Sequence, residues 1–315
     1  MPLARRVLSG ATMGTRYSAV FYARGVEDRS GLSGNLQAAV DAVDAQMSTW
    51  KPDSALMQLN RAPTGAWFKV PGELFAVLAA ALEIGQLSEG AFDIGVGDLV
   101  AAWGFGSQSV CSDRTPLAAA DTAARRPAHL CLELDHTQQR VRKLAALTLD
   151  LSGIAKGFGV DELARVLRAH GIAHFLVSID GELRAVGGKP DGSPWRVAVE
   201  KPETGHRAVE SVLELSDGAV ATSGDYRHVV ERDGDRYGHT MDPRRGAPLA
   251  DGPASVTVMA ETCMAADAWA TALLVLGPRT GVELTTRHGI EALFIDRVPI
   301  ATSDPITPCN TTKEN

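Results

Sequence analysis

Apolar and polar residues follow two different periods along this chain, and each period predicts one kind of element. Where apolar side chains recur every three or four residues, they line one face of a helix. This spacing predicts helices over residues 36–47, 73–87, about 153–170 and 265–276. Turn-forming residues mark their ends, because Gly171 follows the third segment and Gly277-Pro278 follows the fourth.

Short runs of alternating or β-branched residues predict the strands. They cover residues 15–23, 132–134, 147–151, 175–179, 195–200, 212–215 and 255–259, with a hairpin around Asp233-Gly234. Residues 104–130 combine Gly, Ser, Pro and Arg, which predicts a loop with a short helix. Because strands and helices mix without regular strand–helix–strand alternation, the pattern favours an α+β fold with a largely antiparallel sheet.

The domain organisation is predicted from the same pass along the chain. We find no repeat of fixed period and no low-complexity linker, so residues 1–300 are predicted to form a single unit. Residues 301–315 are polar and contain proline, which predicts a frayed C-terminal tail.

The composition is that of a globular protein with an aliphatic core. Of 315 residues, 45% are apolar but only 5% are aromatic, so Val, Leu, Ile and Ala must fill most of the interior. The net charge of −7 argues against nucleic acid as the main partner, since phosphate backbones select concentrated Lys and Arg. For an anionic ligand to bind, a metal ion, a lysine or backbone N–H groups at the site would have to offset the repulsion from this negative charge.

Cysteine spacing and the N-terminus bear on the compartment. The four cysteines are scattered without a CxxC pair, which argues against a disulfide framework and a zinc site. Arg5-Arg6 is not followed by the apolar run of a signal peptide, and no stretch approaches the roughly 18 apolar residues of a membrane span. We therefore expect a cytoplasmic protein, with a periplasmic location as the alternative if an export signal has been removed.

A candidate phosphate site lies where the strand predicted over residues 147–151 gives way to a helix. Asp150 ends the strand, Ser152-Gly153 forms a tight turn, and Lys156 falls in the first turns of the helix. Backbone N–H groups and an ammonium group would then point to one place, which suits a phosphate or diphosphate. The Walker A spacing is absent, and an ordinary strand–turn–helix junction is the simpler alternative.

A candidate metal site lies on the last predicted helix. Asp267 and Thr271 are four residues apart and therefore share one face of that helix. A carboxylate and a hydroxyl one turn apart are hard oxygen ligands of the kind Mg²⁺ accepts. The alternative is structural: an Asp favoured by the helix dipole and a Thr bonded to the preceding turn.

Two further segments carry candidate chemistry. His239 titrates near neutral pH and could accept a proton from an attacking hydroxyl, although a hydrogen-bonded His at a hairpin end explains it equally well. Residues 221–226 are predicted to form a small-residue turn between strands, where a ligand could approach the backbone. Hairpin packing is the alternative for that turn.

Several motifs in order carry more information than any one of them. They are Met13-Gly14-Thr15, Met47-Ser48-Thr49-Trp50, Ala91-Phe92-Asp93-Ile94-Gly95-Val96-Gly97, and residues 150–157, 221–226, 239–243 and 266–273. Together they resemble the motifs of the ApbE family, the FAD:protein FMN transferases. The resemblance runs from about residue 10 to residue 297, nearly the whole chain.

The resemblance implies a fold, ligands and site residues. The fold would be α+β of the T-fold kind, with FAD as substrate and Mg²⁺ as metal. The positions implied for the FAD site are Met13, Trp50, Ala91, Phe92, Asp93, Asp150, Lys156 and Met241. The backbone carbonyl of Gly153 would join Asp267 and Thr271 on the metal, and His239 is the implied catalytic base.

The reaction that the resemblance implies is transfer of the FMN half of FAD to a threonine hydroxyl of an acceptor flavoprotein, with release of AMP. Mg²⁺ and Lys156 would neutralise charge on the diphosphate. Two other functions use the same residues: a metal-dependent FAD pyrophosphatase, with water in place of the acceptor, and a non-catalytic FAD-binding protein.

The chain departs from the family pattern in three places. Trp50 stands where Tyr is common, which keeps flavin stacking but loses a hydroxyl contact. Asp180-Gly181 stands where Gly-Gly is frequent, which raises a question about local backbone geometry. Arg244-Arg245-Gly246 stands after Asp-Pro where any residue followed by Thr-Gly is usual, so the departure is at Arg245.

Overall fold

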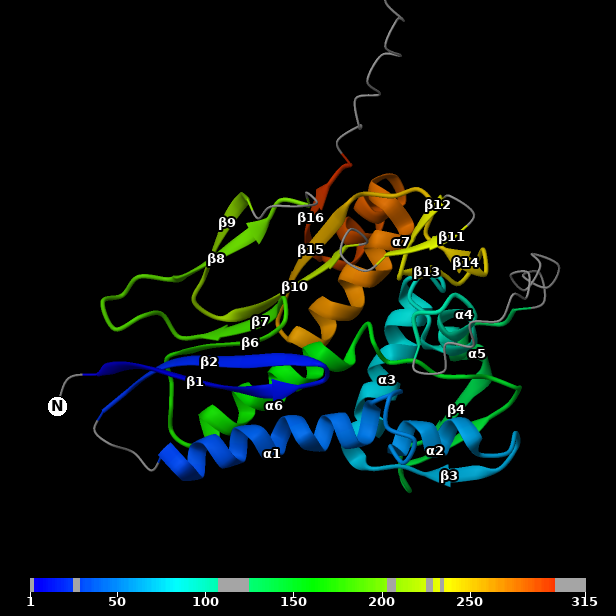
Figure 1. Ribbon diagram of the computed structural model, residues 1–315, viewed down its shortest axis with the longest axis horizontal. Coiled ribbons are helices and arrows are strands. Elements are labelled where there is room, and N and C mark those ends of the chain that lie inside the picture. Colours follow the sequence, from blue (N-terminus) through cyan, green and yellow to red (C-terminus); the bar gives the residue numbers. More distant parts are fainter. Residues whose placement is uncertain are drawn as a thin grey trace, which may run out of the picture.

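A seven-stranded antiparallel sheet forms the centre of the fold (Figure 1). The computed structural model describes residues 3–24, 29–106, 125–202, 208–224, 229–232 and 235–297. The sheet has the order β1-β2-β6-β7-β10-β15-β16, and each strand runs antiparallel to its neighbours. Its strands are β1 (Ala4–Thr12), β2 (Thr15–Ala23), β6 (Phe175–Ile179), β7 (Glu182–Val186), β10 (Gly218–Gly224), β15 (Ser255–Ala260) and β16 (Glu291–Ile295).

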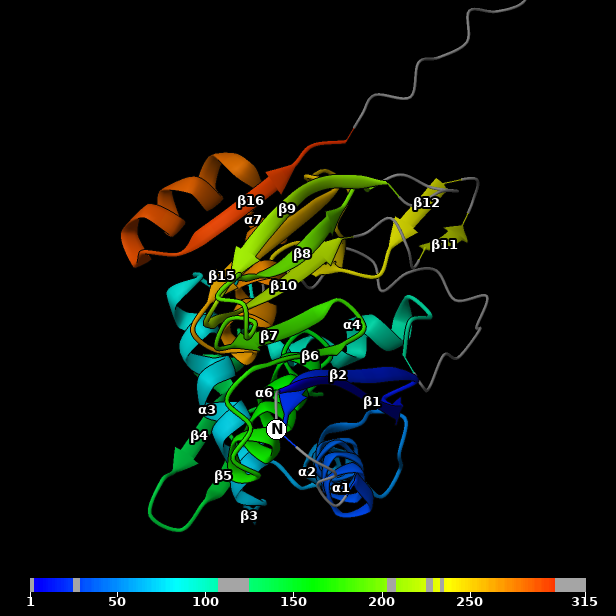
Figure 2. The same cartoon turned by 90° about the vertical axis from the view of Figure 1, so that its left-hand side faces the viewer.

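Helices α6 (Ala155–Ala169) and α7 (Cys263–His288) cover one face of this sheet, and α1 (Arg29–Met47) packs against α6 (Figures 1 and 2). The alternation in β2 explains the packing, because Tyr17, Ala19 and Phe21 are buried in the core that α6 and α1 share with the sheet. Burying each large apolar side chain contributes about 1.5–3 kcal/mol.

The opposite face of the sheet is covered in part by a hairpin. Its strands are β8 (Trp195–Glu200) and β9 (Val209–Leu215), and Trp195 packs with Leu183 and Val220 of the sheet in a smaller cluster. Helices therefore cover one face of the sheet, and the β8–β9 hairpin covers part of the other.

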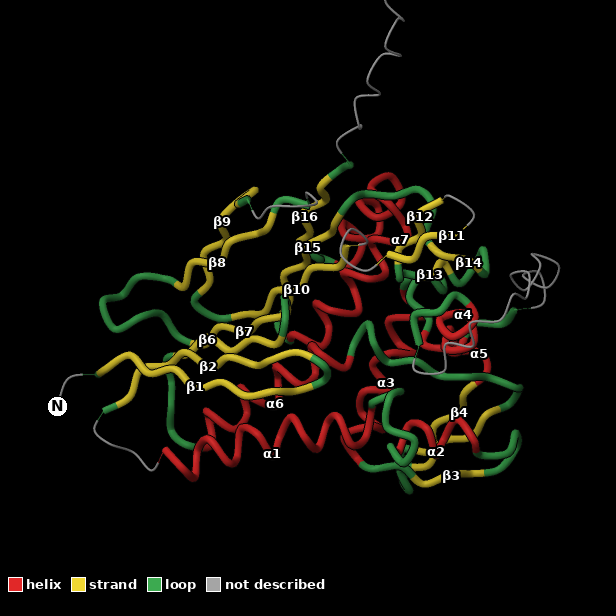
Figure 3. The backbone as a smooth tube through the Cα atoms, in the orientation of Figure 1, coloured by secondary structure: helices red, strands yellow, loops and turns green. Residues whose placement is uncertain are grey.

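The remaining elements lie to one side of the sheet, on the right in Figure 3. They include the helices α2 (Ala55–Arg61), α3 (Gly72–Leu87), α4 (Gly97–Ala102) and α5 (Ala128–Cys131), with the 3₁₀ turn η1 (Ile94–Val96). The small sheets are β3 (Trp67–Lys69), β5 (Arg140–Lys143) and β4 (Leu132–Asp135); β11 (Val229–Arg232) and β12 (Asp235–Gly238); and β13 (Met241–Asp242) and β14 (Ala247–Pro248). Among the helices of the described ranges, none has the length and apolarity needed to cross a membrane.

Two tight turns lie side by side at one end of the sheet. Met13 and Gly14 join β1 to β2 with φ values of 46° and 74°, as a type I′ turn requires. Asp180 and Gly181 join β6 to β7, and Asp180 has a φ of 57°. Because β2 pairs with β6, both turns face the N-terminal end of α6.

The structure confirms the predicted α+β class and its antiparallel sheet. Strands appear at each predicted position except residues 147–151, and the helices predicted over residues 36–47, 73–87 and 153–170 correspond to α1, α3 and α6. The hairpin around Asp233-Gly234 is confirmed by the pairing of β11 with β12, although its turn lies outside the described residues. The predicted tail at residues 301–315 and most of the loop over residues 104–130 also lie outside them.

Three predictions about elements were wrong. Residues 147–151 form no strand, because the Leu149 peptide pairs with the Asn60 side chain instead of a neighbouring strand. Residues 221–224 are not a turn but the end of β10, while residues 225–226 lie outside the described part.

The third error concerns the last helix, which does not stop at Gly277. Gly277 takes a φ of 71° and interrupts α7, and Pro278 then starts a second helical stretch that runs to His288. Proline is tolerated in a first helical turn, where its missing N–H is not needed. The break is therefore a kink, and Gly289 with a φ of 64° provides the true C-terminal cap.

Candidate functional site

The N-terminal parts of α6 and α7 meet at the centre of the candidate site, and Gly157 permits this contact. A Cβ atom at Gly157 would lie 2.7 Å from the carbonyl carbon of Cys263 and 2.8 Å from Cβ of Asp267. The close approach lets the Gly157 N–H donate a hydrogen bond of 3.0 Å to Asp267 Oδ2. Asp267 is therefore held by α6 as well as by its own helix.

Thr271 lies one helical turn after Asp267 and faces the turn that precedes α6. A Cβ atom at Gly153 would come within 3.1 Å of Thr271 Oγ1 and 3.3 Å of the Phe92 ring. The fold thus brings together Gly153, Asp267 and Thr271, the residues predicted as metal ligands.

Asp267 lies in an environment that disfavours its charged form. Its residue exposure is 4%. Burial, and then the neighbouring charge of Glu182, raise the pKa of its carboxyl group to about 7, against the lowering effects of Lys156 and the Gly157 N–H. A cation bound at this carboxylate would take the place of a proton.

Lys156 is surrounded by carboxylates. Its Nζ lies 2.7 Å from Glu182 Oε1 and 3.7 Å from Asp180 Oδ2. Burial lowers the pKa of the ammonium group, but the charges of Glu182 and Asp267 outweigh burial and hold the pKa above its ordinary value. Lys156 therefore stays charged, and the surplus of negative charge around it favours a further cation.

Asp161 of α6 fixes the start of α7. Its Oδ1 accepts a hydrogen bond of 3.1 Å from the Cys263 N–H, and its Oδ2 accepts one of 2.9 Å from the Met264 N–H. Arg184 of β7 pairs with the same carboxylate. Because the first N–H groups of a helix lack partners within it, this carboxylate sets where α7 begins and so where Asp267 lies.

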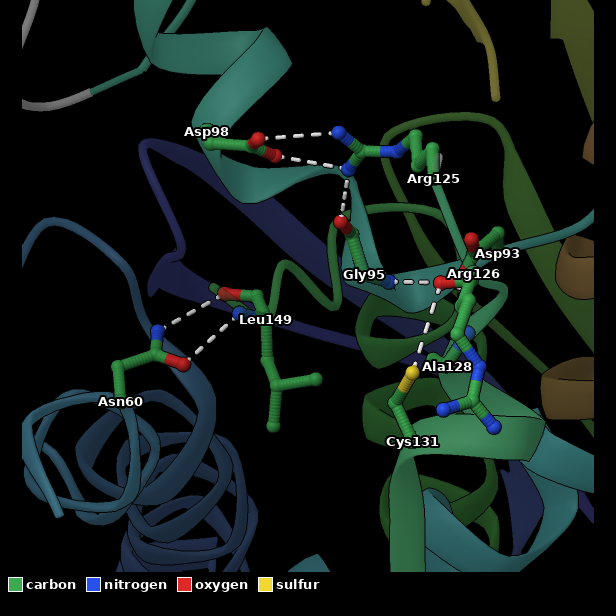
Figure 4. Close-up of polar contacts among 9 residues, drawn as sticks. All are labelled: Asn60, Asp93, Gly95, Asp98, Arg125, Arg126, Ala128, Cys131 and Leu149. Carbon is green, nitrogen blue, oxygen red and sulfur yellow. Dashed lines mark hydrogen bonds and ion pairs between the residues drawn. The ribbon is translucent and has the colours of Figure 1, made fainter. Parts of the chain in front are cut away.

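Asp93 is anchored by backbone N–H groups, as Figure 4 shows. Its Oδ1 accepts hydrogen bonds from Gly95 N at 2.8 Å and Ala128 N at 3.0 Å. Burial raises the pKa of the Asp93 carboxyl group, although these bonds and the charge of Arg125 lower it. Arg125 also donates to the Gly95 carbonyl and pairs with Asp98, so both sides of the η1 backbone are held.

Asp150 is placed by its backbone neighbours. Its N–H donates to the Ile94 carbonyl at 2.8 Å, and its Oδ1 accepts from the Ser152 N–H at 2.7 Å. One residue earlier, the Asn60 side chain bonds both the N–H and the carbonyl of Leu149, at 2.8 and 2.9 Å (Figure 4). Asp93 and Asp150 therefore lie on two segments that are hydrogen-bonded to each other.

The other predicted site residues lie on several elements. Met13, in the β1–β2 turn, reaches α6, where its Cε would be 3.0 Å from a Cβ atom at Gly159. Ala91 and Phe92 follow α3 and are buried, and Met241 is buried in β13. Trp50 follows α1 and is 68% exposed.

His239 lies between β12 and β13. It is half-buried, and its ring centroid is 6.5 Å from that of Phe105 in a T-shaped arrangement. This places the predicted base near the end of α4, on a different element from the α6–α7 contact.

The structure accounts for one departure from the family pattern and shows the contacts of the residue next to another. Asp180 adopts a φ of 57°, a conformation that favours glycine but that Asp tolerates better than most residues. Arg244 bonds the Asp242 carboxylate, and its Nη2 donates to the Val275 carbonyl at 3.3 Å, close to the kink in α7. Arg244 thus ties the β13–β14 turn to the helix that carries Asp267.

Several residues that shape the site escaped prediction from the sequence. These are Asn60, Arg125, Asp161 and Glu182, none of which belongs to a motif with a fixed spacing to its partner. Glu182 directly follows Asp180-Gly181, so its nearness to a turn was the one available signal. Their partners lie far along the chain, which only the fold reveals.

The donors at the α6–α7 contact suit a hard cation. Within the described ranges, no three side chains of His, Cys, Asp or Glu are grouped to hold a metal. Asp267 offers a carboxylate and Thr271 a hydroxyl that lies against Gly153, and such hard oxygen donors are of the type that binds Mg²⁺ together with waters and phosphates.

Comparison with known sequences places the chain among flavin transferases. The pattern of the ApbE family matches residues 13–294. The FAD:protein FMN transferase of Vibrio cholerae is 39% identical over 295 residues, covering 91% of this chain and 86% of that protein. The FAD:protein FMN transferase of Escherichia coli K12 is 37% identical over 294 residues, covering 92% and 84%.

Solved structures agree with the sequence comparison. The flavin transferase ApbE from Vibrio cholerae superposes with a TM-score of 0.84 at 37% identity, over 95% of each chain. The apo form of the flavinyl transferase ApbE from Pseudomonas stutzeri gives a TM-score of 0.83 at 38% identity, over 95% of this chain and 93% of that one.

Proposed function

Because this chain belongs to the ApbE family, we propose that it transfers the FMN part of FAD to an acceptor protein. The observation that carries the proposal is the meeting of the predicted metal and phosphate residues where α6 and α7 touch. The Gly157 N–H donates a hydrogen bond to Asp267, and Thr271 lies against Gly153. Lys156 directly precedes Gly157 in the first turn of α6.

The finer form of the proposal names the reacting groups. A threonine hydroxyl of the acceptor attacks the FMN-side phosphorus of FAD, the bond from that phosphorus to the bridging oxygen breaks, and AMP leaves. The hydroxyl proton passes to a base, for which His239 is the candidate. Its imidazole is half-buried, and an imidazole ring nitrogen is a common general base for a hydroxyl proton.

Lys156 supplies fixed positive charge to the diphosphate. Its ammonium group is oriented by Glu182 at 2.7 Å and remains charged at neutral pH. A charge that is already in position costs little reorganisation when negative charge develops on the phosphate oxygens. Asp93 and Asp150, held on adjoining segments, would orient the rest of FAD together with Met13 and Trp50.

Mg²⁺ is the proposed metal at Gly153, Asp267 and Thr271. When bound, it would stabilise negative charge on the diphosphate and the departing AMP. The chain's own contribution is an oxygen donor set fixed by the Gly157 N–H and by packing against Phe92.

The alternative function, hydrolysis of FAD to FMN and AMP, uses the same residues with water as the nucleophile. A non-catalytic FAD-binding protein is the second alternative. The two enzymatic functions differ in whether AMP release requires an acceptor, so that dependence is the property to measure.

The test measures AMP release from FAD and Mg²⁺ with and without a threonine-containing acceptor flavoprotein. We expect AMP release to depend on the acceptor and to be lost in Asp267→Asn. AMP appearing at the same rate without acceptor would establish the hydrolase instead, and no AMP under either condition would leave only FAD binding.

A further inference from the structure

Ser223 lies in a position from which it can act on the proposed metal site, although no ligand role was predicted for it. It belongs to β10, a central strand on which α7 packs. Its Oγ lies 3.1 Å from Thr271 Oγ1, within hydrogen-bond distance.

The direction of Ser223 follows from the alternation along β10. Ala221 faces the main core with Ala268 and Ala272 of α7, so Ser223, two residues later, points the same way. Thr222 points to the opposite face, where its hydroxyl pairs with that of Thr257 at 2.8 Å. One strand therefore offers two hydroxyl pairs, and only one of them faces the site.

A hydroxyl group that binds a cation must direct its proton elsewhere. A threonine in a helix commonly donates that proton to the carbonyl four residues earlier. Within the described residues, the Thr271 hydroxyl instead lies within hydrogen-bond distance of Ser223 Oγ. If Thr271 donates to Ser223 Oγ, a lone pair of Thr271 Oγ1 is left to face Gly153 and Asp267.

We propose that Ser223 is a positioning residue of the metal site, which accepts the Thr271 proton and so orients the Thr271 oxygen toward the cation. The inference rests on the proposed metal site at Asp267 and Thr271. Groups that orient metal ligands through hydrogen bonds typically change metal affinity about 10–100-fold when removed. The expected effect of losing this hydroxyl is therefore on metal affinity rather than on folding.

The experiment titrates Mg²⁺ alone into the FAD-free protein by calorimetry, so that activity plays no part in the readout. We expect Ser223→Ala to bind Mg²⁺ about 10–100-fold more weakly than wild type. Ser223→Thr keeps a hydroxyl and should bind close to wild type. Ser223→Val has the shape of Thr without the hydroxyl, so the Thr and Val variants separate hydrogen bonding from packing even if the Ala variant folds poorly.

Thr222→Val is the matched control, because it removes a hydroxyl pair from the opposite face of the same strand. It should leave Mg²⁺ affinity unchanged. Equal Mg²⁺ binding by wild type, Ser223→Ala and Ser223→Val would overturn the role of Ser223 and leave the proposed metal site standing. A wild-type protein that binds no Mg²⁺ would overturn both.

Discussion

At the scale of single residues, the site depends on how charges are paired. Lys156 neutralises part of the charge of Glu182 and Asp267, both of which are nearly excluded from solvent. The Glu182 carboxylate, 2.7 Å from Lys156 Nζ, orients the ammonium group. The same pairing makes removal of either partner costly, because a buried charge is then left alone.

A mutant cycle tests this pairing. Lys156→Met should destabilise the protein by about 1–3 kcal/mol, a value reduced from that of a fully buried pair because Lys156 is partly exposed. Glu182→Gln in the same chain should restore part of the loss, since it removes the carboxylate left unpaired. Denaturant unfolding of the single and double variants measures the coupling, and strictly additive losses would contradict direct pairing.

The raised pKa of Asp267 predicts a pH dependence for the metal-free protein. A carboxyl group whose folded pKa is about 7, above its ordinary 3.8, stabilises the fold below 3.8 and loses that contribution as the pH rises through 7. Because Mg²⁺ requires the carboxylate, its affinity should rise with pH and level off above about 7.

Calorimetry between about pH 5.5 and pH 8 measures both effects, with proton release on Mg²⁺ binding at the acidic end. Asp267→Asn provides the control for the stability of the metal-free protein, since it cannot titrate and should remove the pH dependence of unfolding that this group contributes. Mg²⁺ affinity that stays constant across the range in wild type would contradict the assignment.

At the scale of elements, one close helix contact positions the site. The contact of α6 with α7 at Gly157 brings Asp267 to the start of α6, and Asp161, one turn further along α6, bonds the first turn of α7. The helix α6 was predictable from its apolar spacing and from Gly171. The contact between α6 and α7 was not predictable, because a glycine in the sequence does not reveal which element packs against it.

Substitution of Gly157 tests this contact. Gly157→Ala places a methyl group against the Cys263 backbone, which cannot move aside as a flexible side chain could, and should destabilise by about 1–3 kcal/mol. Gly34→Ala in α1 is the matched control, because nothing lies within 4 Å of its added Cβ atom. That variant should be stabilised by about 0.4–1 kcal/mol, since alanine restricts the unfolded chain.

Thermal unfolding of the two alanine variants supplies the comparison. Equal stability changes at both positions would show that α6 and α7 do not need the glycine contact. A loss confined to Gly157→Ala, together with weaker Mg²⁺ binding, would tie the contact to the site.

At the scale of the whole molecule, the spacing of apolar residues and the order of the motifs predicted the α+β class, most elements and the family. These features depend on local sequence. What they missed depends on distant partners. The segment at 147–151 has the alternation of a strand, but Asn60, 89 residues away, takes its hydrogen bonds. The kink at Gly277 was predicted as an end, since a glycine–proline pair looks the same in both cases.

The residues of the site also divide into those predictable from local sequence and those that depend on distant partners. Gly153, Asp267 and Thr271 were predicted from motifs and are brought together by the fold. Glu182 and Ser223 act through Lys156 and Thr271, on strands whose place beside α6 and α7 is set by the order of the sheet. Residues that act through others follow from three-dimensional contacts and not from spacing along the chain.

The central claim, that this protein transfers FMN from FAD to another protein, is tested most directly by the intact mass of the acceptor. We expect an acceptor flavoprotein incubated with FAD, Mg²⁺ and the wild-type protein to gain the mass of FMN less one water, and to gain nothing when its target threonine is replaced by valine. An acceptor whose mass stays unchanged while FAD is consumed would contradict the account.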